Sequence, residues 1–254
     1  MNEYEVFMIG ILYFSSTGNS LYIAQKIQKR LGGQIKYIPS YEGNGGEFEK
    51  ILVVTPIYSY GLPTFVYDLL PRLDRRKEII IIQNYGGIIG GANYLAYQYC
   101  AKNGLNLKAV YVVKMPENYT LTFTVPQFYI KSTLKKAEMR IEKIIDKIEN
   151  EQYELPQKHK TREKRYLINK SNWHIIGERF VVNERCVKCR KCVNVCPAGN
   201  IALVDGKIVF EHNCVACLGC YHRCPQKAIT YLGKKKKDRY INPNIKQDDL
   251  GKDL

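Results

Sequence analysis

The chain has 254 residues, of which 45% are hydrophobic, and its 39 Lys and Arg against 24 Asp and Glu give a formal net charge of +15. This length allows more than one domain and is too great for a small secreted scaffold held together by disulfides. We find neither a secretory signal nor an apolar run long enough to span a membrane, so we expect a cytoplasmic protein.

The chain opens with an apolar strand that leads through a polar turn into a helix. Residues 6–14 are nearly all apolar, too few for a membrane span but suited to a buried parallel strand. The helical pattern that follows runs to Leu31, where two glycines stop it. Free amides and hydroxyls at the positive end of a helix favour a bound phosphate, although such a hexapeptide can also be an ordinary polar turn. The turn consists of Ser15, Ser16, Thr17, Gly18, Asn19 and Ser20.

Strand and helix patterns then alternate up to about residue 113. Helices near 63–73 and 91–103 separate the last three strands, which favours an α/β fold with a doubly wound parallel sheet. In such sheets a ligand lies beyond the carboxyl ends of the strands, where the strand order reverses. We therefore expect the loops after the first, third and fourth strands to form a site. The further strands are predicted at residues 34–38, 50–55, 78–83 and 106–113.

These loops resemble those of the flavodoxins over residues 4–150. Ser15, Thr17, Gly18 and Ser20 match the flavodoxin phosphate loop, Ser/Thr-x-Thr-Gly-x-Ser/Thr, position by position. The resemblance implies a five-stranded sheet of order 2-1-3-4-5 that binds FMN, with the phosphate in this first loop and the ring between the other two. Tyrosines there offer aromatic faces, and glycines let backbone amides approach the ring. The ring loops consist of Pro56, Ile57, Tyr58, Ser59, Tyr60 and Gly61, and of Asn84, Tyr85, Gly86 and Gly87.

The third of these loops departs from the flavodoxin pattern. Flavodoxins commonly carry acidic residues around it, and this chain has none there. The departure leaves the redox potential and the choice of partner open, but not phosphate binding.

Eight of the nine cysteines lie in two copies of one spacing, C-x-x-C-x-x-C-x-x-x-C-P. Three thiolates spaced in this way reach three corners of one [4Fe–4S] cube, and the fourth, beside a proline, crosses to a second cube. Zinc sites instead use C-x-x-C pairs separated by longer loops. We therefore predict two crossed clusters. Their ligands are Cys186, Cys189, Cys192 and Cys224 for one, and Cys214, Cys217, Cys220 and Cys196 for the other.

The segment around these cysteines resembles the two-cluster bacterial ferredoxins from about residue 177 to 233. The two copies superimpose after a shift of 28 residues, and Asp205-Gly206 predicts a hairpin between residues 201–204 and 207–210. Neither half has enough apolar residues to fold alone, so the clusters are expected to form its core. The predicted organisation is a flavodoxin-like domain at 1–152, a basic linker at 153–176, a smaller α+β ferredoxin-like domain at 177–236 and a polar tail at 237–254.

Between the two predicted cofactor regions the chain is first helical and then basic. Apolar residues at three- and four-residue spacing over 130–148, most of them isoleucines, predict a helix that covers the sheet. Residues 156–191 hold eleven basic side chains against three acidic ones, and Lys234, Lys235, Lys236 and Lys237 add to the excess. Because two cubes and a flavin phosphate would remove only part of the positive charge, an acidic redox protein is the expected partner and nucleic acid is disfavoured. The linker lacks glycine- and serine-rich stretches, so we expect it to dock, with Trp173 and His174 packing at the junction.

These features together resemble a flavodoxin–ferredoxin fusion protein, which implies electron transfer. FMN can exchange two electrons one at a time, and each cube carries one. Two other functions stay open: an FMN-dependent reductase of a small substrate such as a quinone or a nicotinamide, and a redox sensor that uses its clusters. We find no nucleophile–base arrangement, and the sequence leaves a homo-oligomer open.

Overall fold

The structure is a computed structural model that describes residues 8–121, 124–232 and 238–254. Its centre is a parallel sheet of five strands in the order β2-β1-β3-β4-β5, as predicted. This order is that of flavodoxin-like folds, in which the chain reverses direction across the sheet between β1 and β3. The strands are β1 (Ile9–Tyr13), β2 (Gln34–Tyr37), β3 (Lys50–Pro56), β4 (Glu78–Tyr85) and β5 (Leu107–Lys114).

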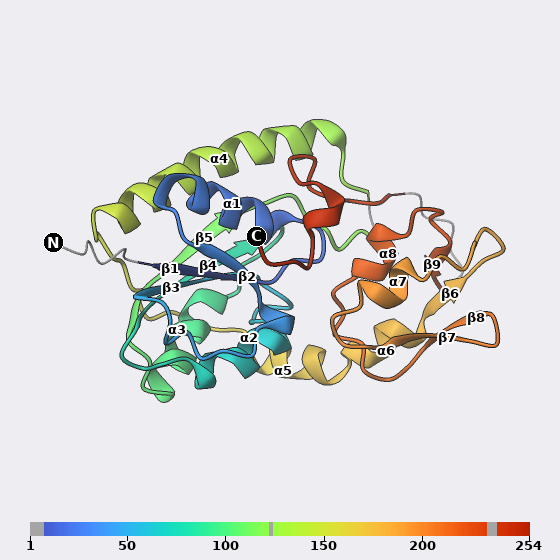
Figure 1. Ribbon diagram of the computed structural model, residues 1–254, viewed down its shortest axis with the longest axis horizontal. Helices are drawn as coiled ribbons and strands as arrows, with labels where there is room; N and C mark the ends of the chain where they lie inside the picture. Colours follow the sequence, from blue (N-terminus) through green and yellow to red (C-terminus); the bar gives the residue numbers. More distant parts are fainter. Residues whose placement is uncertain (1–7, 122–123, 233–237) are drawn as a thin grey trace, which may run out of the picture.

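Helices cover both faces of this sheet (Figure 1). One face packs against α1 (Asn19–Leu31) and α4 (Gln127–Glu149), and the other against α2 (Thr64–Leu69) and α3 (Ala92–Lys102). Alternate residues from position 11 to position 14 belong to the two opposite cores, and all four are fully buried. Covering on both faces explains why these strands read as continuous apolar runs. Short 3-10 turns lie at Ile38–Ser40, Leu70–Arg72 and Gln247–Asp249.

The basic linker packs against the flavodoxin-like domain and contains two helices, α5 (Glu163–Ser171) and α6 (Trp173–Glu178). Tyr166 is 2% exposed and donates its hydroxyl to the Leu62 carbonyl at 2.9 Å. Trp173 is 5% exposed and packs edge-on against both Tyr166 and Tyr58, with ring centroids 6.1 Å apart in each pair. The linker is therefore docked, as its composition predicted. Of the two residues expected at the junction, Trp173 is buried there and His174 is only partly buried.

The small C-terminal domain consists of two antiparallel strand pairs and two short helices. β6 (Phe180–Val182) pairs with β9 (Ile229–Tyr231), and β7 (Ile201–Val204) pairs with β8 (Lys207–Phe210). The predicted hairpin is confirmed, and Asp205 and Gly206 both have positive φ, 48° and 72°, as a two-residue type I′ turn requires. The helices are α7 (Lys191–Asn194) and α8 (Gly219–Arg223).

The last residues, 238–254, return to the flavodoxin-like domain. Leu254 exchanges two backbone hydrogen bonds with Ile35 of the edge strand β2, each 3.0 Å long. Tyr240, Ile245 and Leu250 are at most 8% exposed and join the core beneath α1 and α4. The segment set apart as a polar tail is thus a packed part of the first domain. The four lysines at 234–237 lie outside the described residues.

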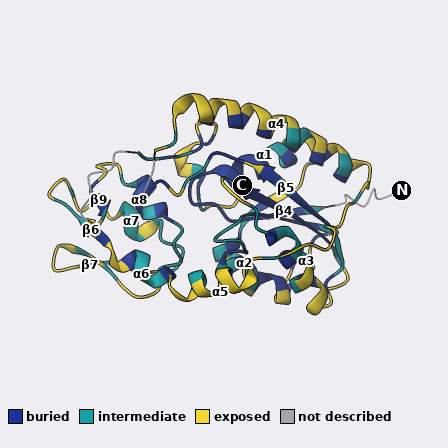
Figure 2. Cartoon of the chain, turned by 180° about the vertical axis from the view of Figure 1, so that it is seen from behind, coloured by how far each residue is buried: buried dark blue, intermediate teal, exposed yellow. Residues whose placement is uncertain are grey.

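Burial follows this layered arrangement, with the inner strands β1, β3 and β4 almost wholly buried and the outer surfaces of α4 and α5 exposed (Figure 2). Among the helices of the described ranges, none is both long and apolar enough to cross a membrane.

Candidate functional site

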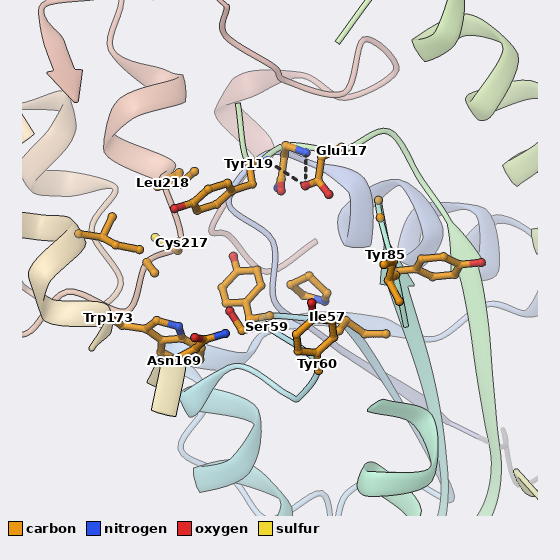
Figure 3. A pocket seen from close by; sticks show the side chains of 18 of the residues that line it. Ile57, Ser59, Tyr60, Tyr85, Glu117, Tyr119, Asn169, Trp173, Cys217 and Leu218 are labelled. Carbon is orange, nitrogen blue, oxygen red and sulfur yellow. Dashed lines mark hydrogen bonds between the residues drawn. The ribbon is translucent and has the colours of Figure 1, made fainter. Parts of the chain in front are cut away.

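A cavity of about 780 Å³ lies between the two domains, at the carboxyl ends of β3, β4 and β5 (Figure 3). This volume is within the range of small-molecule and cofactor sites. Both predicted ring loops line it, except for Gly61, and the first loop contributes Asn19. The lining residues that the sequence analysis had selected are Asn19, Pro56, Ile57, Tyr58, Ser59, Tyr60, Asn84, Tyr85, Gly86 and Gly87.

The first loop is almost wholly buried, and of its six residues only Asn19 lines the cavity. Three of its hydroxyl oxygens accept hydrogen bonds. Thr17 Oγ1 accepts from Asn118 Nδ2, and Ser20 Oγ accepts from Asn84 Nδ2, each at 2.8 Å. Ser15 Oγ accepts a backbone amide within the loop at 2.9 Å. Each hydroxyl keeps its own proton, so each can still donate to an anion.

The C-terminal segment holds the start of α1 in place. Asn19 Oδ1 accepts from the Tyr240 hydroxyl at 2.6 Å and from Asn242 Nδ2 at 3.2 Å, while its Nδ2 donates to the Pro116 carbonyl at 3.0 Å. Gly18 precedes it with φ 96°, a left-handed conformation that a side chain would strain. Asn19 is thus held from two sides at the edge of the cavity.

The second loop is a tight turn under backbone strain. Tyr58 and Gly61 exchange two backbone hydrogen bonds of 2.9 and 3.0 Å, and Ser59 and Tyr60 between them have φ of 49° and 77°. Residues other than glycine in this region cost about 1–3 kcal/mol each, and such strain gathers at functional sites. Arg162 of the linker stabilises the turn, because it stacks over the Tyr60 ring and donates to its hydroxyl at 3.1 Å.

Glu117 supplies an acidic group beside the third loop that sequence reasoning missed. It follows β5, and a Cβ on Gly86 would lie 2.5 Å from the Glu117 Cα. Its carboxylate accepts the amides of Asn118 and Tyr119, both at 2.9 Å (Figure 3). The three loops selected from the sequence did not include the one after β5, although the same rule about strand ends applies to it.

Half of the six aromatic residues that line the cavity come from outside the predicted ring loops. Tyr119 and Trp173 line it from opposite sides, while the ring of Tyr85 points away from both (Figure 3). Trp173 belongs to the linker, so the cavity is completed only when the linker docks. Further linker and small-domain residues complete the wall: Asn169, Asn172, Ile175, Ile176, Arg179 and Tyr231.

The cavity also reaches the second cysteine motif. Ala216, Cys217 and Leu218 line it, and Ser16 Oγ of the first loop donates to the Cys217 carbonyl at 2.7 Å. Burial raises the pKa of Cys217 to about 12. The thiolate form of such a buried cysteine needs a neighbouring cation, as a coordinating metal provides.

The eight motif cysteines gather into two groups that each take one member from the other copy. Cys224 of the second copy lines a small cavity together with three cysteines of the first. Cys196 of the first copy lies near three cysteines of the second copy, because its charge contributes to the raised pKa of each of them. The amides of Asn200 and Ala228 donate to Cys196 and Cys224 at 3.2 and 3.3 Å, four residues after each. The groups are Cys186, Cys189, Cys192 and Cys224, and Cys196, Cys214, Cys217 and Cys220.

The ninth cysteine, Cys100, lies apart from both groups. It belongs to α3 and is fully buried in the core that α3 shares with α2, and burial raises its pKa to about 12. Within the described part of the chain, no group of three or more His, Cys, Asp or Glu is arranged to hold a single metal ion.

The family model of the 4Fe-4S dicluster domain matches residues 159–229. Among solved structures, a Fusobacterium nucleatum flavodoxin bound to flavin mononucleotide is 18% identical, with 57% of this chain and 98% of that one covered and a TM-score of 0.42. A Megasphaera elsdenii flavodoxin is 24% identical, with 42% and 85% covered and a TM-score of 0.36. A search of curated proteins finds no match.

The chain thus combines a flavodoxin-like fold, which the strand order itself defines, with a segment that matches the 4Fe-4S dicluster domain. This combination resembles the flavodoxin–ferredoxin fusion that the sequence motifs suggested. Flavodoxin-like and iron–sulfur parts joined in one chain are those of an electron-transfer protein.

Proposed function

We propose that this protein transfers electrons within one chain, between FMN in the interdomain cavity and two [4Fe–4S] clusters held by the eight motif cysteines. The observation that carries the proposal is the contact between the two sites. Cys217 lines the same cavity as the ring loops, and its carbonyl accepts a hydrogen bond from Ser16 of the phosphate loop. A ligand of one cofactor site is therefore a wall of the other.

The cavity and the loop beside it suit FMN. The volume of about 780 Å³ is sufficient, and Asn19 of the first loop lines the cavity. Next to Asn19, the start of α1 offers amides without intrahelical partners, together with the buried hydroxyls of Ser15, Thr17 and Ser20. Tyr60, Tyr119 and Trp173 supply aromatic surface at the other end of the site. When bound, FMN supplies an exchange between two-electron and one-electron transfer.

The cysteine groups suit two cubes with crossed ligands. Each group contains four thiols, which is the number that one [4Fe–4S] cluster requires. The amides directed at Cys196 and Cys224 would stabilise negative charge on sulfur and so raise the reduction potential. The cluster of the second motif lies next to the flavin site through Cys217, and the cluster of the first motif lies beyond it.

Anaerobic rapid mixing of the loaded protein with a reductant that reacts only at the flavin tests this proposal. Absorbance should show flavin reduction followed by cluster bleaching, at a rate that does not depend on protein concentration. Cys217→Ala is the control, because loss of the adjacent cluster should abolish the fast second phase and leave the first. A second phase whose rate rises in proportion to protein concentration would show that the domains are separate carriers.

A second candidate is the reduction of a small substrate at the same cavity. The cavity extends past the ring loops to Asn169, Asn172 and Arg179, which could hold a polar acceptor beside the flavin. Steady-state assays with a quinone and with a nicotinamide should then show saturation, with a higher KM in Arg179→Ala. A turnover rate that rises linearly with acceptor concentration and is unchanged in Arg179→Ala would rule out a specific substrate site.

A further inference from the structure

The two cysteine motifs share one backbone but differ in charge. The first runs Arg185-Cys-Val-Lys-Cys-Arg-Lys-Cys192 and the second Asn213-Cys-Val-Ala-Cys-Leu-Gly-Cys220. Every position that differs between these stretches is basic in the first copy and uncharged in the second. The backbone at these positions is matched: Lys188 and Arg190 have φ of 56° and 60°, and so do Ala216 and Leu218. Local geometry therefore does not account for the difference in residue type.

The uncharged loop is the one that faces the flavin site. Ala216 and Leu218 line the interdomain cavity, and Leu218 is 4% exposed. A Cβ on Gly219 would lie 3.5 Å from the Ser16 Cβ of the phosphate loop. Small or apolar residues suit this packed contact, because a buried unpaired charge is strongly destabilising.

The charged loop faces solvent instead. Residues 185–192, here called the basic loop, include Lys188, Cys189 and Arg190, all exposed. Cys189 is the only exposed cysteine of the eight motif cysteines. Lys188 and Arg190 line the small cavity that the first cysteine group shares. The loop therefore surrounds the accessible edge of this cluster site with positive charge.

Neighbouring charges offset this excess only in part. Lys227 adds a positive charge beside the loop, where Arg185 donates to its carbonyl at 3.0 Å. Two exposed carboxylates lie nearby. Glu184 directly precedes the loop, and Asp205 lies in the hairpin turn, where a Cβ on the next residue, Gly206, would be 3.2 Å from Lys188 Nζ. Lys191 pairs with Asp248 at 3.5 Å, and both side chains are at least one-third exposed. Lys188 and Arg190 are the basic residues that directly flank the exposed cysteine in the chain.

We propose that the basic loop is the docking surface for an acidic one-electron carrier protein. This inference rests on the proposed function, since it makes the first-motif cluster site the point of exchange. One partner loses one electron, the other gains one, and no atoms move. Positive charge around a small exposed site speeds the encounter with an acidic protein and orients it. The loop contains no aromatic residue on which a nucleic acid base could stack, which favours a protein partner.

Binding of an acidic two-cluster ferredoxin to the loaded protein tests the proposal, with the association rate measured at several salt concentrations. The test variant is Lys188→Ala with Arg190→Leu, which places the residues of the second copy on a backbone where this chain already accommodates them. Its matched control is Lys135→Ala with Lys136→Leu on the exposed face of α4, with the same change of charge. Basic cytochrome c and a single-stranded DNA oligonucleotide complete the panel of probes.

We expect the test variant to lose on the order of tenfold in association rate with the ferredoxin at low salt, and the control to lose much less. Wild-type binding should weaken as salt rises, and cytochrome c should not bind. Equal losses in both variants would show that only net charge matters and would overturn the proposal. Loss of DNA binding with ferredoxin binding unchanged would also overturn it. Iron, sulfide and flavin contents and the rate of cluster reduction by the flavin are measured in every variant. If these keep their wild-type values while ferredoxin binding does not follow the expectation, the docking proposal fails and the proposed function stands.

Discussion

Gly61→Ala should disturb the cavity through the linker, because Gly61 lies at the end of its ring loop, against Tyr166. A Cβ at this position would lie 2.4 Å from the Tyr166 ring, which cannot easily move because its hydroxyl is bonded to the Leu62 carbonyl. Overpacking of this kind costs about 1–3 kcal/mol. The φ of Gly61 is not in the left-handed region, so the cost arises from the contact with Tyr166 alone. Trp173, stacked edge-on against Tyr166, should shift with it.

The emission of Trp173 reports this change directly, because it is the only tryptophan of the chain. In Gly61→Ala the emission should move to longer wavelength, and the urea midpoint that it reports should fall by roughly 0.5–1 M at ordinary m-values. Gly87→Ala is the control, since its Cβ would meet only the Glu117 carboxylate, at 3.5 Å. Adding Tyr166→Leu should cancel most of the effect of Gly61→Ala, as coupled neighbours do. An unchanged midpoint and spectrum would show that the linker does not pack against Gly61.

Three further predictions concern cysteines and the phosphate loop. Cys196→Ser should damage the cluster of the second motif and spare that of the first, and EPR that shows the opposite pattern would refute the crossed assignment. Thr17→Glu should lose FMN and keep its iron, while Thr17→Ser keeps both; stoichiometric FMN at wild-type affinity in Thr17→Glu would place the phosphate elsewhere. Cys100 should resist iodoacetamide in the native protein at pH 8, because burial raises its pKa from 9.0 to about 12, and rapid labelling without unfolding would contradict its position. The neutral thiol is the form favoured by the fold, so this group supports stability below about pH 9 and opposes it as pH rises from 9 towards 12.

The features that could be predicted from the sequence are those with a short-range signal. The apolar strands, the hairpin across Asp205 and Gly206 and the repeated cysteine spacing each occupy a few consecutive residues, where turn chemistry and periodicity act directly. The strand order followed from resemblance to a family. Together these were enough to locate the edge of the sheet where the cavity lies.

Other parts of the site depend on contacts between residues far apart in the chain. Glu117 reaches the third loop from the end of β5, and Trp173 closes the cavity from a linker whose helices α5 and α6 were not predicted. The pairing of Leu254 with Ile35 joins segments more than two hundred residues apart, and no sequence pattern predicts it. Which cysteine loop faces the interdomain cavity was likewise settled by domain docking. The sequence shows that one loop is charged and the other is not, and only packing shows which of them is buried, because burial is decided by the surface that another element covers.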